Sequence, residues 1–243
     1  MAILKMDIPP VQLFASTQTH NYNIERIKFL DDIGIKRIIL ARELSLERIK
    51  EIRNSVKADL EFFVHGALCV CLSGQCYMSQ AITGRSANRG ECAQPCRMEY
   101  SLIDRNGKVV VRDKHLLSLR DLDLSAYLND LLEAGITSFK IEGRLKDIGY
   151  VKNITSYYRQ KLDAIIENNS LYEKSSSGYS IIPFEPDPER TFNRGYTSYF
   201  VDGKDPDLSS IDTPKSKGKF LGNVSSVDRE GFTIDTYETI ITS

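Results

Sequence analysis

The sequence has no long hydrophobic run and no excess of charge. Its 243 residues include 32 lysines and arginines against 33 aspartates and glutamates, so no global basic field points to a nucleic-acid ligand. No apolar stretch approaches the length of a membrane-spanning helix, and we find no hydrophobic signal segment at the N-terminus. Hydrophobic residues make up 41% of the chain, enough to bury a core without disulfides. We therefore expect reduced thiols and a cytoplasmic location.

Cysteine is scarce except in one stretch, residues 69–96, which holds all five. Four of them, Cys69, Cys76, Cys92 and Cys96, are separated by six, fifteen and three residues, and such a cluster of thiolates is typical of a soft-metal site. A disulfide framework is disfavoured in a chain of this length without a signal segment. Four thiolates suit structural Zn²⁺, although zinc ribbons usually pair two C-x₂-C knuckles. An iron–sulfur cluster also takes four thiolates and tolerates uneven spacing, so spacing leaves both metals open. Cys71 is interpreted as a spare thiol or a small buried residue.

Four segments carry a specific resemblance. Residues 61–79 read E-x-F-x-x-G-A-L-C-x-x-x-x-G-x-C-x-M-S, and residues 84–97 read G-R-S-A-N-R-G-E-C-A-Q-P-C-R. Together with K-I-E-G-R at 140–144 and F-N-R-G-Y-T at 192–197, they resemble the collagenase-like peptidases of unassigned catalytic type, peptidase family U32. The similarity extends from about residue 11 to about residue 224.

The resemblance implies a metal and a chemistry. Members of this family include prephenate-dependent hydroxylases of a tRNA wobble uridine or a ribosomal RNA cytidine, and proteins of oxygen-independent ubiquinone hydroxylation. These members hold a [4Fe–4S] cluster on four cysteines, which correspond here to Cys69, Cys76, Cys92 and Cys96. By resemblance, an iron–sulfur cluster is favoured over Zn²⁺, RNA is the substrate and prephenate is the oxygen donor. The family also carries an older protease label from its collagen-degrading members.

The pattern along the chain alternates strands and helices. Predicted strands span residues 11–15, 37–40, 60–64, 115–119 and 138–141, with helices at 23–32, from Ser45 onward, at 125–134 and at 146–167, and a hairpin joins 100–103 to 109–111 around Asn106-Gly107. About five βα units predict an α/β fold with a parallel sheet, and the chain has no Gly-rich phosphate loop that would support a dinucleotide-binding fold. The resemblance implies a TIM-type barrel, which needs eight units. We therefore predict an incomplete TIM-type (β/α) barrel in an N-terminally shortened member of the family.

Two regions are expected. Residues 1–170 form the partial barrel with a cysteine-rich metal loop at 66–97, and residues 171–243 form a connector and a small β-rich C-terminal extension at 190–200 and 219–241. An isolated five-unit sheet would expose edges, so a homo-oligomer or a swapped dimer is a possible outcome.

Catalytic residues of such folds gather at the carboxyl ends of the strands. The candidate catalytic residues are Lys140, Glu142 and His65. The candidate substrate-binding residues are Arg85, Arg89, Arg144, Arg194 and Gln18, because planar Arg forks bind carboxylates such as those of prephenate. RNA affinity is assigned to Arg85, Arg89 and Arg97, while the basic residues between 144 and 161 are interpreted as a solvated helix face.

The leading hypothesis is an iron–sulfur enzyme that hydroxylates RNA. A peptidase is the second class, but Cys71 with His65 is the one nucleophile–base pair that can be imagined, and on a short loop the two side chains should point apart. The third is a metal-bound accessory protein or an inactive truncated one.

Overall fold

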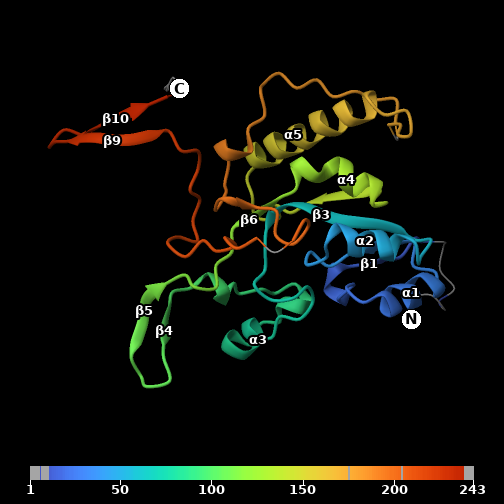
Figure 1. The fold of residues 1–243 in the computed structure, drawn as a ribbon, viewed down its shortest axis with the longest axis horizontal. Coiled ribbons are helices and arrows are strands. Elements are labelled where there is room, and N and C mark those ends of the chain that lie inside the picture. Colours follow the sequence, from blue (N-terminus) through green and yellow to red (C-terminus); the bar gives the residue numbers. More distant parts are fainter. Residues whose placement is uncertain (1–5, 7–10, 175, 204, 238–243) are drawn as a thin grey trace.

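The computed structural model describes residues 6, 11–174, 176–203 and 205–237. Its main unit is a six-stranded sheet in the order β1-β2-β3-β6-β8, with β7 paired to β3 (Figure 1). The strands are β1 (Phe14–Ala15), β2 (Arg37–Ile39), β3 (Asp59–Ala67), β6 (Asp121–Asp123), β7 (Ser138–Ile141) and β8 (Tyr196–Thr197). The pairs β1–β2, β2–β3 and β3–β7 are parallel, which confirms a mixed α/β fold with a parallel sheet.

Helices follow the strands, and three of the described helices start at a capping side chain. They are α1 (Ile24–Asp32), α2 (Leu46–Arg53), α3 (Met78–Thr83), α4 (Leu128–Glu133) and α5 (Ile148–Glu167). Short 3₁₀ turns lie at Thr17–Thr19, Ala87–Arg89, Pro95–Arg97, Ser125–Tyr127 and Pro188–Arg190. The side chains of Asn23, Ser45 and Asp147 accept backbone N–H bonds at the starts of α1, α2 and α5, as N-caps do. Leu60, Phe62 and Val64 of β3 are buried in the hydrophobic core.

One predicted strand is wrong. Residues 115–119 form a turn, in which the Ser118 N–H donates to the carbonyl of His115 (2.9 Å); the strand follows as β6 and runs antiparallel to β3. The Leu119 carbonyl, which a strand would use in its ladder, accepts instead from the Arg97 guanidinium (2.6 Å). Within 190–200, two residues form β8. The described strands make an open sheet, and no closed barrel is found among them.

Two hairpins project from this unit as separate two-stranded sheets (Figure 1). They are β4 (Tyr100–Ile103) with β5 (Val109–Lys114), and β9 (Gly222–Val227) with β10 (Phe232–Thr236). The first was predicted as a hairpin, and the second lies in the predicted β-rich stretch 219–241, of which 238–241 lie outside the described residues. At the first turn Gly107 has a φ of 82°, and the Asp104 carboxylate accepts the N–H groups of Asn106 and Lys108. None of the described helices is long and apolar enough to cross a bilayer.

Candidate functional site

A cavity of about 560 Å³ lies where β3 leads into the cysteine-rich loop. Cys69, Cys71, Cys76, Cys92 and Cys96 all line it. Its polar and charged lining includes Gln18, Arg42, Arg97, Glu142, Arg144, Lys146 and Arg194. The structure therefore brings the four predicted ligand cysteines to one cavity. Three predicted site residues that follow β7 in the chain, Glu142, Arg144 and Arg194, line it as well.

Two glycines allow the loop to approach the rest of the site. Gly66 has a φ of 112°, and a Cβ atom there would lie 2.6 Å from the carbonyl oxygen of Glu142. Gly74 has a φ of 74°, and its Cβ atom would lie 2.4 Å from the carbonyl oxygen of Gln18. Any other residue would combine backbone strain with a steric clash. These glycines therefore hold the cysteine-rich loop against the chain segments that carry Glu142 and Gln18.

Side chains of the loop fix its irregular path. The backbone N–H of Cys76 donates to Asn88 Oδ1 (2.9 Å). The hydroxyl of Ser79, in α3, accepts the N–H of Ala93 (3.1 Å), next to Cys92. Because backbone donors outside regular structure need such partners, these bonds set the positions from which the cysteine side chains enter the cavity.

The thiols are free and close enough to influence one another. All five cysteines are reduced. Burial raises the pKa of the Cys96 thiol, and charge on Cys69, Cys92 or Cys76 raises it further. A hydrogen bond with Cys71 lowers the pKa of Cys69 to about 6, and the positive charge of Arg42 acts in the same direction. Among the described residues, no three or more His, Cys, Asp or Glu side chains are grouped to hold a single metal ion.

Cys71, interpreted from the sequence as a spare thiol or a small buried residue, is half-buried and lies with the other thiols. Its hydrogen bonds with Cys69 and Cys76 raise its pKa, and it lines the same cavity. The chain bends at Val70 and Cys71 instead of continuing as a strand. Cys69 and Cys71 are two residues apart, a spacing that keeps their side chains on the same side even in a continued strand.

Arg42 is a site residue that the sequence analysis missed. Its guanidinium forms an ion pair with Glu142, lies 4.1 Å from the centre of the Phe63 ring and places Nη1 3.8 Å from Cys69 Sγ. Its side chain is 10% exposed. Arg42 follows the predicted strand at 37–40, so the strand-end rule that selected Glu142 could also have found it.

The predicted substrate-binding residues divide into two groups. Gln18, Arg144 and Arg194 line the cavity, whereas Arg85 and Arg89 are exposed on the loop around it. Arg194 reaches the cavity from a buried ion pair with Asp121, at 2.8 Å.

Two further predicted residues have their donors engaged. The Arg97 guanidinium donates to Ser118 Oγ (2.7 Å) and to the carbonyl oxygens of Leu119 and Leu68. It therefore holds the cysteine-rich loop on the sheet, and its contact with RNA stays a prediction. Lys140 Nζ lies 3.3 Å from a Glu61 carboxylate oxygen, on the sheet itself.

The basic residues between 144 and 161 do not share one solvated helix face. Lys146 lines the cavity before α5 begins, and burial lowers its pKa to about 8. Farther along α5, Arg159 pairs with Asp163, and Lys161 lies over the Tyr157 ring. Lys146 is thus a second cavity residue that the sequence analysis misplaced.

His65 is buried behind the cavity in a cage of three tyrosine rings. The ring centres of Tyr150, Tyr158 and Tyr196 lie 6.2, 5.5 and 5.4 Å from the imidazole centre. Its Nδ1 lies 3.3 Å from the Tyr158 hydroxyl, which donates to the carbonyl of Val64 (2.8 Å). Burial lowers the pKa of His65 despite the carboxylates of Asp123 and Asp121 nearby.

Acid is therefore expected to destabilise the fold through His65. The folded pKa lies below the ordinary 6.5, so the native state binds fewer protons than the unfolded state, and stability falls as pH drops below about 6.5. His65→Gln removes this titration. The difference in free energy of unfolding between wild type and variant should therefore become smaller as pH is lowered from 7.5 to 5.5. Urea unfolding at both pH values measures it. A gap that stays constant would assign the acid sensitivity to other groups.

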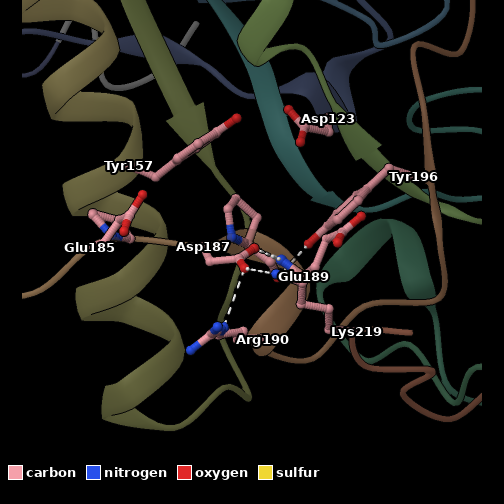
Figure 2. Close-up of a pocket in the computed structure, with 10 residues that line it drawn as sticks. Asp123, Tyr157, Glu185, Asp187, Glu189, Arg190, Tyr196 and Lys219 are labelled. Carbon is pink, nitrogen blue, oxygen red and sulfur yellow. Dashed lines mark hydrogen bonds and ion pairs between the residues drawn. The ribbon is translucent and has the colours of Figure 1, made fainter. Parts of the chain in front are cut away.

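A second cavity, of about 420 Å³, lies beside α5 and is lined by Asp123, Tyr157, Tyr196 and the segment 185–190 (Figure 2). Asp187 caps the 3₁₀ turn there and accepts ion pairs from Arg190 (3.3 Å) and Lys219 (3.0 Å). From the sequence, this segment was predicted to be part of a connector, and its residues carry no signal for a cavity.

Comparisons with known proteins agree with the resemblance. The model of peptidase family U32 matches residues 1–210. The chain is 50% identical over 240 residues to a 23S rRNA 5-hydroxycytidine C2501 synthase of Escherichia coli, covering 99% of this chain and 37% of that protein. It is 38% identical to tRNA hydroxylation protein P1 of Bacillus subtilis, over 64% of this chain and 38% of the relative. It is 31% identical to a collagenase of Porphyromonas gingivalis, over 76% and 46%.

The chain thus spans less than half the length of each of these three relatives. No solved structure matches the chain.

Proposed function

The chain belongs to peptidase family U32, and on this basis we propose that it carries the catalytic site of an RNA hydroxylase that forms 5-hydroxycytidine in ribosomal RNA. The observation that carries the proposal is one cavity lined by the four proposed ligand cysteines, by Glu142 and by several Arg and Lys side chains. We favour ribosomal cytidine over tRNA uridine because the relative named as a 23S rRNA 5-hydroxycytidine synthase is 50% identical over 99% of this chain.

Cys69, Cys76, Cys92 and Cys96 would hold a [4Fe–4S] cluster. These four reduced thiols line one cavity and supply the donor set that such a cluster takes, with Zn²⁺ as the alternative metal. When bound, the cluster would supply one-electron chemistry. Arg42, with Nη1 at 3.8 Å from Cys69 Sγ, would place a positive charge beside one ligand.

Prephenate, the proposed oxygen donor, carries two carboxylates that the cavity cations can bind. Arg144 is exposed at the rim and offers a free planar fork. Arg194 and Arg42 are already paired with Asp121 and Glu142, so we assign them to electrostatics and positioning. Lys146 is half-buried, and its pKa of about 8 lets it carry a charge or exchange a proton near neutral pH.

Of the three candidate catalytic residues, we retain Glu142 for contact with the reacting groups because its side chain lines the cavity. Lys140, paired with Glu61, and His65, buried among tyrosines, are assigned to positioning the strand ends.

A peptidase is the second candidate, since one relative is named a collagenase. The Cys71 thiol is hydrogen-bonded to the Cys69 and Cys76 thiols, while His65 Nδ1 contacts the Tyr158 hydroxyl. The nucleophile–base geometry of a cysteine peptidase is therefore missing from this pair. Casein cleavage that survives metal removal would favour the peptidase.

We also propose that the sheet is part of a (β/α) barrel, residues 1–170, followed by the extension at 171–243. The parallel run β1-β2-β3-β7 with intervening helices supports this arrangement, whereas the antiparallel β6 departs from it.

A segment exchange tests the proposed function. In an E. coli strain that lacks its 23S rRNA 5-hydroxycytidine C2501 synthase, we express that synthase with its matching 240-residue segment replaced by this chain. Because the segment carries the whole cysteine cavity, hydroxylation should return, measured as 5-hydroxycytidine by mass spectrometry of digested 23S rRNA. A folded, iron-loaded exchange protein without this nucleoside would contradict the proposal.

A further inference from the structure

The two exposed hairpins have the same architecture and opposite charge. In β4–β5, residues 100–114 carry four cations and two carboxylates. In the turn and strands of β9–β10, Arg229 is accompanied by Asp228, Glu230 and Asp235. Because a solvated two-stranded ribbon does not need to be basic, the excess of positive charge in β4–β5 is not required by its fold.

Three of the β4–β5 cations are available to a ligand. Arg105, Lys108 and Arg112 are exposed, and among the residues that the structure describes none of them pairs with a carboxylate. The two carboxylates of the hairpin are used internally: Asp104 accepts N–H groups of the turn, and Asp113 bonds to Ser101 Oγ (2.8 Å). The fourth cation, Lys114, pairs with Asp212 (2.8 Å). The hairpin thus presents uncompensated positive charge at and near its turn.

The base of the hairpin is tied to the cysteine-rich loop. The Tyr100 hydroxyl donates to the carbonyl of Pro95 (2.8 Å), and His115 Nδ1 lies 2.9 Å from the carbonyl of Arg97. Pro95 and Arg97 flank Cys96, which lines the cavity. A ligand held on the hairpin is therefore held at a fixed position relative to the cavity.

The hairpin also exposes apolar surface. Leu102, Ile103 and Val110 are 50%, 55% and 59% exposed. Aliphatic side chains beside free cations suit RNA, which offers phosphates to the cations and base or ribose faces to the apolar groups. Two-stranded ribbons are among the elements that enter nucleic-acid grooves.

We infer that the β4–β5 hairpin is an RNA-binding arm that holds phosphates of the substrate RNA beside the cysteine cavity. The inference rests on the RNA substrate of the proposed function and adds where that RNA binds. It shifts the basic contact surface from Arg97, whose donors are engaged inside the protein, to Arg105, Lys108 and Arg112.

Filter binding of an in vitro transcript of the E. coli 23S rRNA region that contains C2501 tests the arm. The arm variant combines Arg105→Gln, Lys108→Gln and Arg112→Gln. The control combines Arg26→Gln, Lys28→Gln and Lys57→Gln, three exposed cations on and near α1 and α2 with the same change in net charge. Each lost phosphate contact removes about 0.7–0.9 from the slope of log affinity against log salt. The arm variant should thus lose about tenfold or more in affinity at about 100 mM KCl and about 2 in slope, and the control should keep both.

The outcomes separate the arm from the proposed function. Equal affinity and slope for arm variant and control, in proteins with wild-type thermal unfolding, would overturn the arm and leave the RNA substrate in place. A wild-type chain that does not bind the transcript would overturn both. If the arm variant unfolds early, Leu102→Ser with Val110→Ser measures the same surface without a change in charge and should also weaken binding.

Discussion

Replacement of Cys92 by alanine is expected to remove the metal and abolish RNA hydroxylation. A [4Fe–4S] cluster needs four thiolates, and Cys92 is one of the four proposed ligands that line the cavity. Iron in anaerobically purified protein should fall from about four atoms per chain to less than about one, with loss of the thiolate-to-iron absorbance. In the segment-exchange synthase, 5-hydroxycytidine should disappear.

Cys71→Ala is the matched control, because Cys71 lines the same cavity and its thiol is hydrogen-bonded to those of Cys69 and Cys76. It should keep the iron and the activity. The reverse result, with iron lost in Cys71→Ala and kept in Cys92→Ala, would put Cys71 into the ligand set in place of Cys92. Hydroxylation that persists in a variant without iron would refute the role of the cluster in catalysis, and zinc in place of iron would select the alternative metal.

The sequence predicted those elements whose signals are local. The helices predicted at 23–32 and from Ser45 onward are found as α1 and α2, and β7 has the predicted bounds, Ser138–Ile141. The strand predicted at 115–119 failed because tertiary contacts decide it: the Arg97 guanidinium binds the Leu119 carbonyl. The direction of β6 is likewise a property of its pairing with β3, which no local pattern encodes.

The candidate site shows the same division. Density of thiols alone indicated the cysteine-rich loop, and the strand-end rule found Glu142. The bend at Val70 and Cys71 and the burial that lowers the pKa of Lys146 have no signal in the local sequence pattern. The second cavity beside α5 is formed by an irregular segment, 185–190, whose composition predicts a loop and nothing about its contacts.

One such distant contact has a large expected effect on stability. Asp121, at the start of β6, accepts from Arg194 Nη1 (2.8 Å) and from the Arg194 backbone N–H (3.1 Å). Arg194 Nε in turn donates to the carbonyl of Pro214 (2.7 Å). The Arg194 side chain is 9% exposed and the Asp121 side chain is 5% exposed. This pair therefore joins β6 to the segment before β8 and to the chain beyond it, and it sets the position of Arg194 at the cavity.

Asp121→Asn is expected to lower the free energy of unfolding by about 3–5 kcal/mol, because the Arg194 charge stays buried without its counter-charge. Urea unfolding near pH 7 measures the loss. The control is Asp207→Asn in the exposed pair of Asp207 with Arg120, where the side chains are 63% and 27% exposed and solvent screens the charges, so the loss should be below about 1 kcal/mol. Similar losses in the two variants would mean that water reaches the Asp121–Arg194 pair. If burial is the cause, Asp121→Leu combined with Arg194→Met should recover much of the stability, because neither side chain then leaves an unpaired charge in the core.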